Sequence, residues 1–297
     1  MLHSLPRPSR LVLGVVTCLS LAACGGGDDD LTSFANVTTS RLSAAKYSQK
    51  LVLTLTGQKL GQDLQVTAAN CNGIARSSTA PYVSTDAISY YTCSLDNLGP
   101  GSISVLRVSD NVSMAQLSFT VPTPVVTLSV SQSGTAKADV VVTLDPAKAP
   151  ATVANFLGYV NAGFYDSTVF HRALVNMVAQ GGGFTLAADG TMTQKTTGLR
   201  SPIALEVGKG LSNVQWTIAM ARTADPASAT SQFFFNVVNN AAAFDPSGSN
   251  AGYAVFGSIT AGTATAAAVA AACTSAVTGA ECVPAPAVTI TKAVQSS

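Results

Sequence analysis

The chain has 297 residues, of which 47% are apolar and only 10% charged, whereas an ordinary soluble domain carries about a quarter charged residues. This length suits two domains, each with a core of its own. The 16 Lys and Arg residues nearly balance the 15 Asp and Glu residues, so no basic footprint for nucleic acid is present. His3 and His171 are the two histidines, too few for metal sites built on several imidazoles. We therefore expect no nucleic-acid partner, no metal and no other cofactor.

The first 23 residues have the pattern of a secretory signal. Arg7 and Arg10 precede an apolar run over residues 11–23, which is too short to span a bilayer. The run ends in Leu21-Ala22-Ala23-Cys24, which resembles the lipobox of bacterial lipoproteins, where the cysteine becomes the first mature residue and is acylated. Ordinary cleavage after Ala23, which leaves a free Cys24, is the alternative. We expect residues 1–23 to be removed, Cys24 to carry the lipid, and residues 24–31 to form a flexible tether.

The same resemblance indicates a compartment. Gly25, and not Asp, follows the cysteine, which permits transfer to an outer membrane, so we expect an exported protein anchored there and facing the periplasm. Export exposes the remaining cysteines to oxidation, and four of them allow three pairings. Two disulfides, Cys71 with Cys93 and Cys273 with Cys282, keep each bridge inside its own domain. Metal ligation and a reactive thiol are the alternatives.

Residues 32–122 read as a small β domain. Leu51, Leu53 and Leu55 alternate with polar or smaller residues, and the stretches 102–105 and 115–121 alternate in the same way. Short runs of period two between Gly, Asn, Asp and Pro turns are typical of a β-sandwich. The segment loosely resembles the immunoglobulin-like modules of bacterial surface proteins, and a spacer or adhesion-like role suits it.

A stiff connector at residues 121–124 contains two prolines and separates this segment from the next. Residues 126–130 and 140–144 are predicted to be paired strands. Pro150 opens a helix, because Val153, Phe156, Leu157 and Val160 follow the spacing i, i+3, i+4, i+7 and Gly163 ends it. The alanine-rich residues 264–272 predict a second helix. Short strands occupy the rest, so this part is mainly β with two helices.

Five motifs follow one another along this second part of the chain: Phe170-His171-Arg172, Gln180-Gly181-Gly182-Gly183-Phe184, Thr217-Ile218-Ala219-Met220-Ala221-Arg222, Ser231-Gln232-Phe233-Phe234-Phe235-Asn236 and Tyr253-Ala254-Val255-Phe256-Gly257. Together they resemble a cyclophilin-type peptidyl-prolyl cis-trans isomerase of the bacterial exported branch, over residues 125–297. The resemblance implies a closed eight-stranded antiparallel barrel capped by two helices, with an active groove on its outer surface.

The implied reaction explains the residue types. Rotation about an Xaa-Pro bond faces a barrier of roughly 18–20 kcal/mol because it destroys amide resonance, and no covalent bond has to break. A catalyst needs an apolar cup for the proline ring and a fixed positive donor for the twisted amide. By the resemblance Arg172 is that donor, since arginine stays charged and presents a rigid fork. Gln180 hydrogen-bonds substrate or orients Arg172.

The resemblance also assigns the substrate-binding residues. Met177, Phe234 and Phe244 form the proline pocket. Ala221 and the backbone of Arg222 form the edge that receives the extended substrate chain. Tyr253 is a further substrate-binding residue. Alternation sends Phe234 toward the groove and its two neighbours toward the core. His171 is expected to point away from the groove in a structural role, with general-base chemistry as the alternative. Trp216 stands where the family has a small residue, and either a groove wall or a local filler fits.

Two departures from the family pattern bear on activity. Val175-Asn176-Met177 replaces Pro-Gly-Phe, and Ala243 stands near the place of an aromatic residue, so the pocket is expected to grip proline loosely and to bind cyclosporin-type ligands poorly. The predicted function is an isomerase, expected as a monomer, that acts on unfolded or partly folded proline-containing polypeptides. A proline-segment-binding chaperone or adaptor without turnover is the alternative, and a purely structural surface lipoprotein is a third.

Overall fold

A computed structural model describes residues 34–272 and 281–297. The chain divides into two compact units, one ending at Val121 and the other beginning at Pro122, and each is described by itself. Within the described residues, no helix combines the length and apolarity that crossing a bilayer requires. The proposed leader, Cys24 and Cys273 lie outside these residues.

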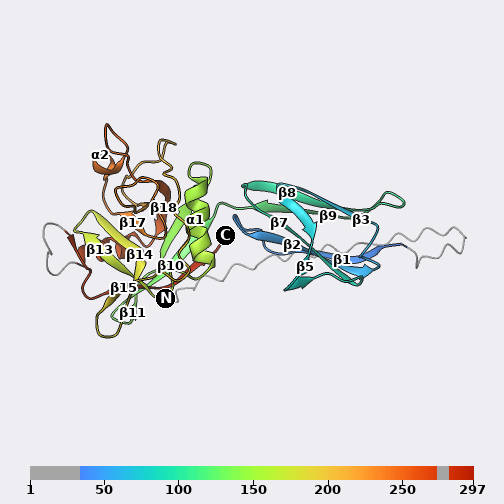
Figure 1. The fold of residues 1–297 in the computed structure, drawn as a ribbon, viewed down its shortest axis with the longest axis horizontal. Coiled ribbons are helices and arrows are strands. Elements are labelled where there is room, and N and C mark those ends of the chain that lie inside the picture. The colour runs from blue at the N-terminus through green and yellow to red at the C-terminus, as the bar shows by residue number, and fades with distance from the viewer. Residues whose placement is uncertain (1–33, 273–280) are drawn as a thin grey trace, which may run out of the picture. The chain divides into compact units, whose positions relative to one another are not determined.

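The first unit consists of two antiparallel sheets and a small hairpin (Figure 1). One sheet has the strand order β1 (Asn36–Leu42), β2 (Lys50–Gln58), β7 (Ile88–Ser94) and β4 (Asn72–Arg76). The other has the order β3 (Leu64–Ala69), β8 (Gly99–Arg107) and β9 (Val112–Val121). The hairpin pairs β5 (Ser78–Thr79) with β6 (Tyr82–Val83).

The core of this unit follows the period-two pattern of its strands. Leu51, Leu53 and Leu55 on β2 are fully buried, as are Ile103 and Val105 on β8. In β8 the residue between Ile103 and Val105 is more exposed. In β2, by contrast, Val52 between Leu51 and Leu53 is also buried. The β domain expected from the alternating sequence is therefore present.

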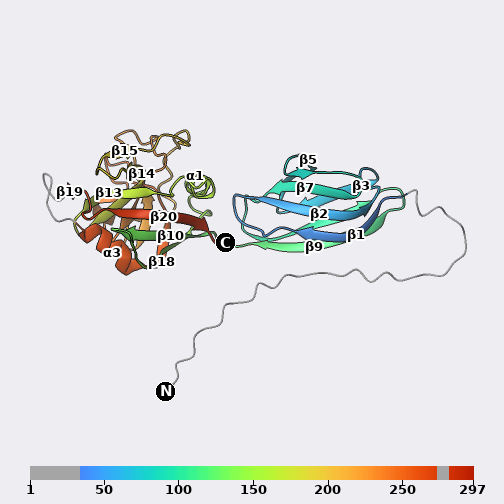
Figure 2. The same ribbon diagram turned by 90° about the horizontal axis from the view of Figure 1, so that it is seen from below.

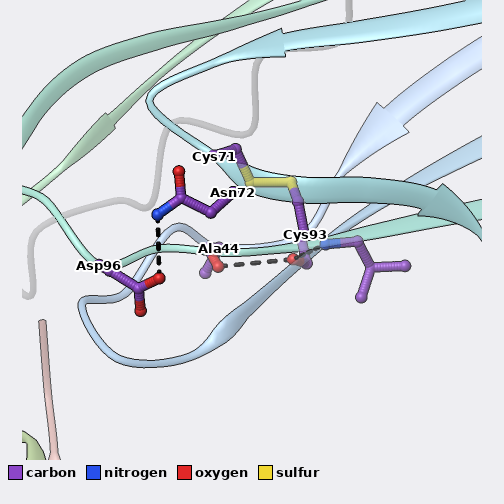
Figure 3. The surroundings of a disulfide bond; sticks show 7 residues. Ala44, Cys71, Asn72, Cys93 and Asp96 are labelled. Atoms are coloured by element: carbon purple, nitrogen blue, oxygen red, sulfur yellow. Dashed lines mark hydrogen bonds between the residues drawn. A yellow bond between two sulfur atoms is a disulfide. The ribbon is translucent and has the colours of Figure 1, made fainter.

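A disulfide joins Cys71, next to the start of β4, to Cys93 on β7 (Figure 3). The two Cα atoms lie 5.5 Å apart, and the residues are 22 positions apart in the sequence. Beside the bridge, the side chain of Asn72 donates a hydrogen bond of 3.1 Å to Asp96. Closing a loop of this length restricts the unfolded chain and stabilises the unit by about 3 kcal/mol. The Cys273–Cys282 bridge stays a prediction, because Cys273 is not described.

The second unit is a closed antiparallel barrel of eight strands, as predicted. In chain order these are β10 (Val125–Gln132), β12 (Val140–Leu144), β13 (Thr168–Leu174), β14 (Val178–Leu186), β16 (Thr217–Met220), β17 (Phe233–Asn236), β18 (Val255–Ala261) and β20 (Val288–Gln295). Around the ring the order is β14, β17, β16, β18, β12, β10, β20 and β13, and the pairing of β13 with β14 closes it. Short strands β11 (Thr135–Ala136), β15 (Met192–Gln194) and β19 (Glu281–Cys282) extend individual pairs.

Two helices lie on opposite sides of the barrel, α1 (Pro150–Asn161) and α3 (Thr263–Ala271), as Figure 2 shows. A third helix, α2 (Ala241–Phe244), has only four residues. Ala149, before α1, cannot cap the helix with its side chain. Instead the carboxylate of Glu206 accepts hydrogen bonds from the backbone N–H groups of Ala151 and Thr152, at 3.1 and 2.6 Å, which satisfies donors that a helix start leaves open.

The barrel interior is filled by aromatic rings. Phe156 of α1 contacts Tyr165, Phe233 and Phe256 at centroid distances of 5.2, 5.6 and 5.1 Å. The buried hydroxyl of Tyr165 donates to the carbonyl of Ser231 at 2.8 Å, so the core contains no unpaired group at this point. The interior is therefore packed, and a binding site has to lie on the outer surface.

Candidate functional site

A hollow of about 280 Å³ opens on the outer face of the barrel unit. Side chains from strands β13, β14 and β17, from helix α2, and from the segments directly after β16 and directly before β18 form its walls. The lining residues are Arg172, Leu174, Val178, Gln180, Ala221, Arg222, Phe234, Phe244 and Tyr253.

Strand register brings the central residues together. Arg172 pairs with Gln180 between β13 and β14, Gln180 with Phe234 between β14 and β17, and Phe234 with Ala219 between β17 and β16. Paired residues of neighbouring strands share a face of the sheet. A row of four side chains from four strands therefore projects to the same side of the barrel wall.

A β-bulge aims Arg172 outward. Phe170 pairs with Gly181 and Arg172 pairs with Gln180, so His171 is an extra residue on β13. Without the bulge, Phe170 and Arg172 would face the same side, because they are two positions apart. With it, Phe170 packs into the core against Phe233 and Phe235, whereas Arg172 lines the hollow. Bulges commonly re-aim a side chain beside an active site.

The apolar part of the hollow is a cup of three rings. Phe234, Phe244 and Tyr253 contact one another edge to face, with centroids 5.6, 5.5 and 5.2 Å apart, the arrangement that aromatic quadrupoles favour. Phe234 is only 4% exposed and packs with Val178, Ala219 and Val255 beneath the cup. Phe233 and Phe235 are fully buried on the other side, as alternation predicts.

Two arginines supply the positive charge of the hollow. Nη1 of Arg172 donates to Oε1 of Gln180 at 2.9 Å, which is the orienting contact anticipated for Gln180. The guanidinium of Arg222 stacks on the ring of Tyr253 at 4.7 Å, and its Nε donates to the carbonyl of Gly252 at 2.9 Å. The sequence assigned only the backbone of Arg222 to the site, whereas its side chain also lines the hollow.

Several placements differ in detail from the expected set. Met177 is partly buried and packs against the same apolar cluster as Phe244 and Tyr253, so its place in the proline pocket stays a prediction. Leu174 and Val178 also line the hollow, and their two-residue spacing from Arg172 and Gln180 is the signal that identifies them. Ala243 is exposed, and Phe244 after it forms the wall. Trp216 is half-buried, with φ of 64°, and lies outside the lining.

Three buried asparagines connect the walls of the hollow, and sequence reasoning missed them. Asn236 donates to Oδ1 of Asn213 at 3.1 Å and accepts from Asn240 at 2.8 Å. Asn213 donates to the carbonyls of Phe244 and Tyr253, both at 3.2 Å. Asn240 donates to the carbonyl of Met177 at 3.1 Å. This asparagine network, formed by Asn213, Asn236 and Asn240, therefore holds the backbone beneath two of the three rings.

The asparagine network ends on a carboxylate. Asp245 accepts hydrogen bonds from the Ser212 hydroxyl and from the backbone and side chain of Asn213. Burial opposes ionisation, but these hydrogen bonds prevail and lower the pKa of Asp245. The carboxylate therefore stays charged at neutral pH and keeps the C-terminal end of α2, which carries Phe244, hydrogen-bonded to Asn213.

The site thus combines a fixed cation, an adjacent amide and an aromatic cup. Such a surface can hold a small apolar ring while a donor acts on a neighbouring carbonyl or amide. Across residues 34–272 and 281–297, no group of three or more His, Cys, Asp or Glu side chains is placed to hold a metal ion.

Comparison with known proteins agrees with this geometry. The family model of cyclophilin type peptidyl-prolyl cis-trans isomerases matches residues 126–295. Peptidyl-prolyl cis-trans isomerase cyp18 of Streptomyces antibioticus is 47% identical over 139 residues, 46% of this chain and 79% of that protein. Peptidyl-prolyl cis-trans isomerase A of Dickeya dadantii is 45% identical over a stretch that covers 43% of this chain and 64% of that protein. For peptidyl-prolyl cis-trans isomerase B of Escherichia coli the identity is 49%, over 34% of this chain and 58% of that protein. A solved cyclophilin from Cryptosporidium parvum, 20% identical, covers 59% of this chain and 98% of its own, with a TM-score of 0.43. The chain belongs to the cyclophilin-type peptidyl-prolyl cis-trans isomerase family.

Proposed function

We propose that the hollow catalyses rotation about Xaa-Pro bonds in exported polypeptides and so assists their folding. The observation that carries the proposal is the placement of the Arg172 guanidinium, held by Gln180 at 2.9 Å, in the same hollow as the ring cup of Phe234, Phe244 and Tyr253. The substrates are unfolded or partly folded chains, because an Xaa-Pro segment has to be accessible to enter the hollow.

Rotation of the prolyl amide needs only noncovalent groups. In the planar amide the nitrogen lone pair is delocalised, whereas in the twisted transition state it is localised on nitrogen and can accept a hydrogen bond. A permanently charged donor therefore stabilises the twisted amide more than the planar one. The cup binds the proline ring in both states, so its role is to hold the bond in reach of Arg172.

The place of action is part of the proposal. What supports it is the signal pattern of residues 1–23, the lipobox-like Cys24, and a disulfide in the first unit, which suits an oxidising compartment. The protein is a monomer tethered by lipid to the outer membrane and faces the periplasm. The first unit, with its loose resemblance to immunoglobulin-like modules, is a spacer between tether and enzyme.

Exchange spectroscopy on a short Xaa-Pro peptide tests the isomerase function. We expect the wild-type chain, at a concentration far below that of the peptide, to raise the cis-trans exchange rate well above the uncatalysed rate, which corresponds to tens to hundreds of seconds. Heat-unfolded protein serves as the control. Peptide signals that broaden through binding, with no faster exchange, would reject the enzyme in favour of the proline-binding adaptor.

The anchor has a separate test in a bacterial host. Metabolic labelling with a radioactive fatty acid is expected to mark the wild-type chain and to leave Cys24→Ala unlabelled, because Cys24 is the acylated residue. Cys18→Ala, in the proposed leader, is the matched control and should label like the wild type. Equal labelling of the wild type and Cys24→Ala would refute the lipid anchor.

A further inference from the structure

A second arginine lines the hollow besides Arg172, and the proposed reaction gives its charge no task. Arg222 lies two residues after the end of β16 and lines the hollow together with Tyr253. Arg172 is assigned to the prolyl amide, whereas only the backbone of Arg222 is assigned to the substrate chain. The guanidinium of Arg222 is therefore a charged group of the site that the rotation itself does not use.

Three contacts hold the Arg222 side chain in place. Its Nε donates to the carbonyl of Gly252 at 2.9 Å, and its Nη1 donates to the carbonyl of Thr223 at 2.8 Å. The guanidinium carbon lies 4.7 Å from the centre of the Tyr253 ring, within the range of a cation–π contact. Because Tyr253 is also a ring of the cup, the charge of Arg222 lies beside the place of the proline. The long side chain is ordered before substrate arrives, so binding does not have to supply that cost.

The turn that supplies the Gly252 carbonyl is fixed as well. Gly252 has a φ of 77°, a backbone conformation that glycine adopts readily, and its N–H donates to Oδ1 of Asn250 at 3.0 Å. A Cβ at position 252 would lie 2.7 Å from the backbone nitrogen of Pro246. The Asn250 side chain also donates to the carbonyl of Asp245 at 3.2 Å. The turn is thereby attached to the end of α2, and the fold determines where the Arg222 guanidinium lies.

The Arg222 guanidinium keeps donors for a further ligand. Arginine carries five N–H donors, and within the described part of the chain Arg222 donates only from Nε and Nη1, to two carbonyls. No carboxylate is among the described residues that line the hollow. Asp225, three residues further along, accepts from the backbone of Ala227 at 2.9 Å, and Asp245 is occupied by the asparagine network. The positive charge of Arg222 therefore has no carboxylate partner among the described residues.

We propose that Arg222 binds an acidic side chain of the substrate, so that the preferred segments carry Asp or Glu within about two residues of the proline. A guanidinium offers a carboxylate two parallel N–H groups, and a cation stacked on one ring of the cup is within reach of the neighbours of the proline, because each residue of an extended chain spans roughly 3.3–3.6 Å. The inference rests on the proposed function, since it names the class of Xaa-Pro segment that the same hollow takes.

Paired peptides test this preference. Short alanine peptides with one central proline and blocked ends carry either Glu or Gln, at the first or second position before or after the proline. Glu and Gln have nearly the same size, so the ratio of kcat/KM within a pair reports the charge alone. For the wild type we expect at least one position to favour Glu by about five-fold at low salt. The ratio should fall toward one in about 1 M salt, which screens the pair.

Variants show whether Arg222 is the group that binds the acid. Arg222→Leu should bring the ratio close to one, and Arg222→Lys should keep part of it. Arg222→Glu should reverse the preference, so that a Lys peptide becomes better than its Gln counterpart at the same position. Arg200→Leu is the matched control, because Arg200 also lies over a tyrosine ring, that of Tyr159, at 5.9 Å and outside the lining of the hollow. Each ratio is measured within one protein, so a variant with lower overall activity still gives a result.

A wild type without a preference for Glu at any of the four positions would overturn the proposal. So would a preference that persists in Arg222→Leu, which would assign it to Arg172 or another group, or one that Arg200→Leu removes equally.

The dissociation constants of the same peptides, from NMR titration, separate this result from the proposed function. A wild type that binds the Glu peptide more tightly without accelerating exchange would remove the isomerase function and keep the acidic preference, as that of a proline-binding adaptor. Accelerated exchange with equal rates and equal affinities in every pair would keep the isomerase and reject the role of Arg222.

Discussion

Arg172→Ala is expected to lower kcat for Xaa-Pro exchange by about 10²- to 10³-fold, the usual effect of deleting one preorganised donor from a site of this kind. The reason is that the guanidinium interacts with the twisted amide more strongly than with the planar one, so its loss falls on the transition state. KM should change little, because the ring cup of Phe234, Phe244 and Tyr253 still holds the proline. Exchange NMR at several peptide concentrations separates the two constants.

Two further variants make this result specific. Arg172→Lys keeps the charge but loses the planar fork, and should lie between the wild type and Arg172→Ala. Arg200→Ala is the control in the same unit, since Arg200 lies near the Tyr159 ring, with 5.9 Å between the guanidinium carbon and the centroid, and takes no part in the hollow. Similar rates for wild type and Arg172→Ala would contradict the role assigned to the guanidinium.

Asn236→Leu is expected to lower the free energy of unfolding of the barrel unit by about 3 kcal/mol. Asn236 is fully buried, and the change takes the partner from Oδ1 of Asn213 and from one donor of Asn240. Leaving a buried polar group without its partner costs about 1–3 kcal/mol per group, even where a side chain of similar size fills the space.

Urea unfolding followed by tryptophan fluorescence measures the effect. Trp216 is the single tryptophan of the chain and belongs to the barrel unit, so its signal reports that unit alone. Asn239→Leu is the control, because Asn239 is exposed and, among the residues that the structure describes, its side chain accepts only from the backbone of Ala241 at 3.1 Å. A change below about 1 kcal/mol is expected there. Equal losses in both variants would show that the asparagine network contributes no stability of its own.

The features predicted from the sequence are those with local signals. The i, i+3, i+4, i+7 spacing after Pro150 predicted α1, the alanine run predicted α3, and alternation predicted that Phe234 and Phe233 face opposite sides. The closed barrel followed from the resemblance carried by five motifs, because periodicity does not reveal which distant strands pair.

What could not be predicted depends on contacts between residues far apart in the chain. Asn213 and Asn236 are 23 positions apart, and they meet only because β16, which follows Asn213, pairs with β17, which ends at Asn236. Helix α2 has four residues, no side-chain cap and no amphipathic periodicity from which it could be predicted. The bulge at His171 has no sequence signal either, because a bulge is defined by how the strand pairs with its neighbour.

The register of strands β13, β14, β17 and β16 determines both which side chains line the outer hollow and which fill the core. The pairing that aligns Arg172, Gln180, Phe234 and Ala219 outward is the pairing that turns Phe233 and Phe235 inward. A slip of one residue in β17 would exchange the two faces of that strand, and a closed ring has no free edge to absorb the slip. A change that shifts β17 by one residue would therefore disrupt the outer site and the aromatic core together.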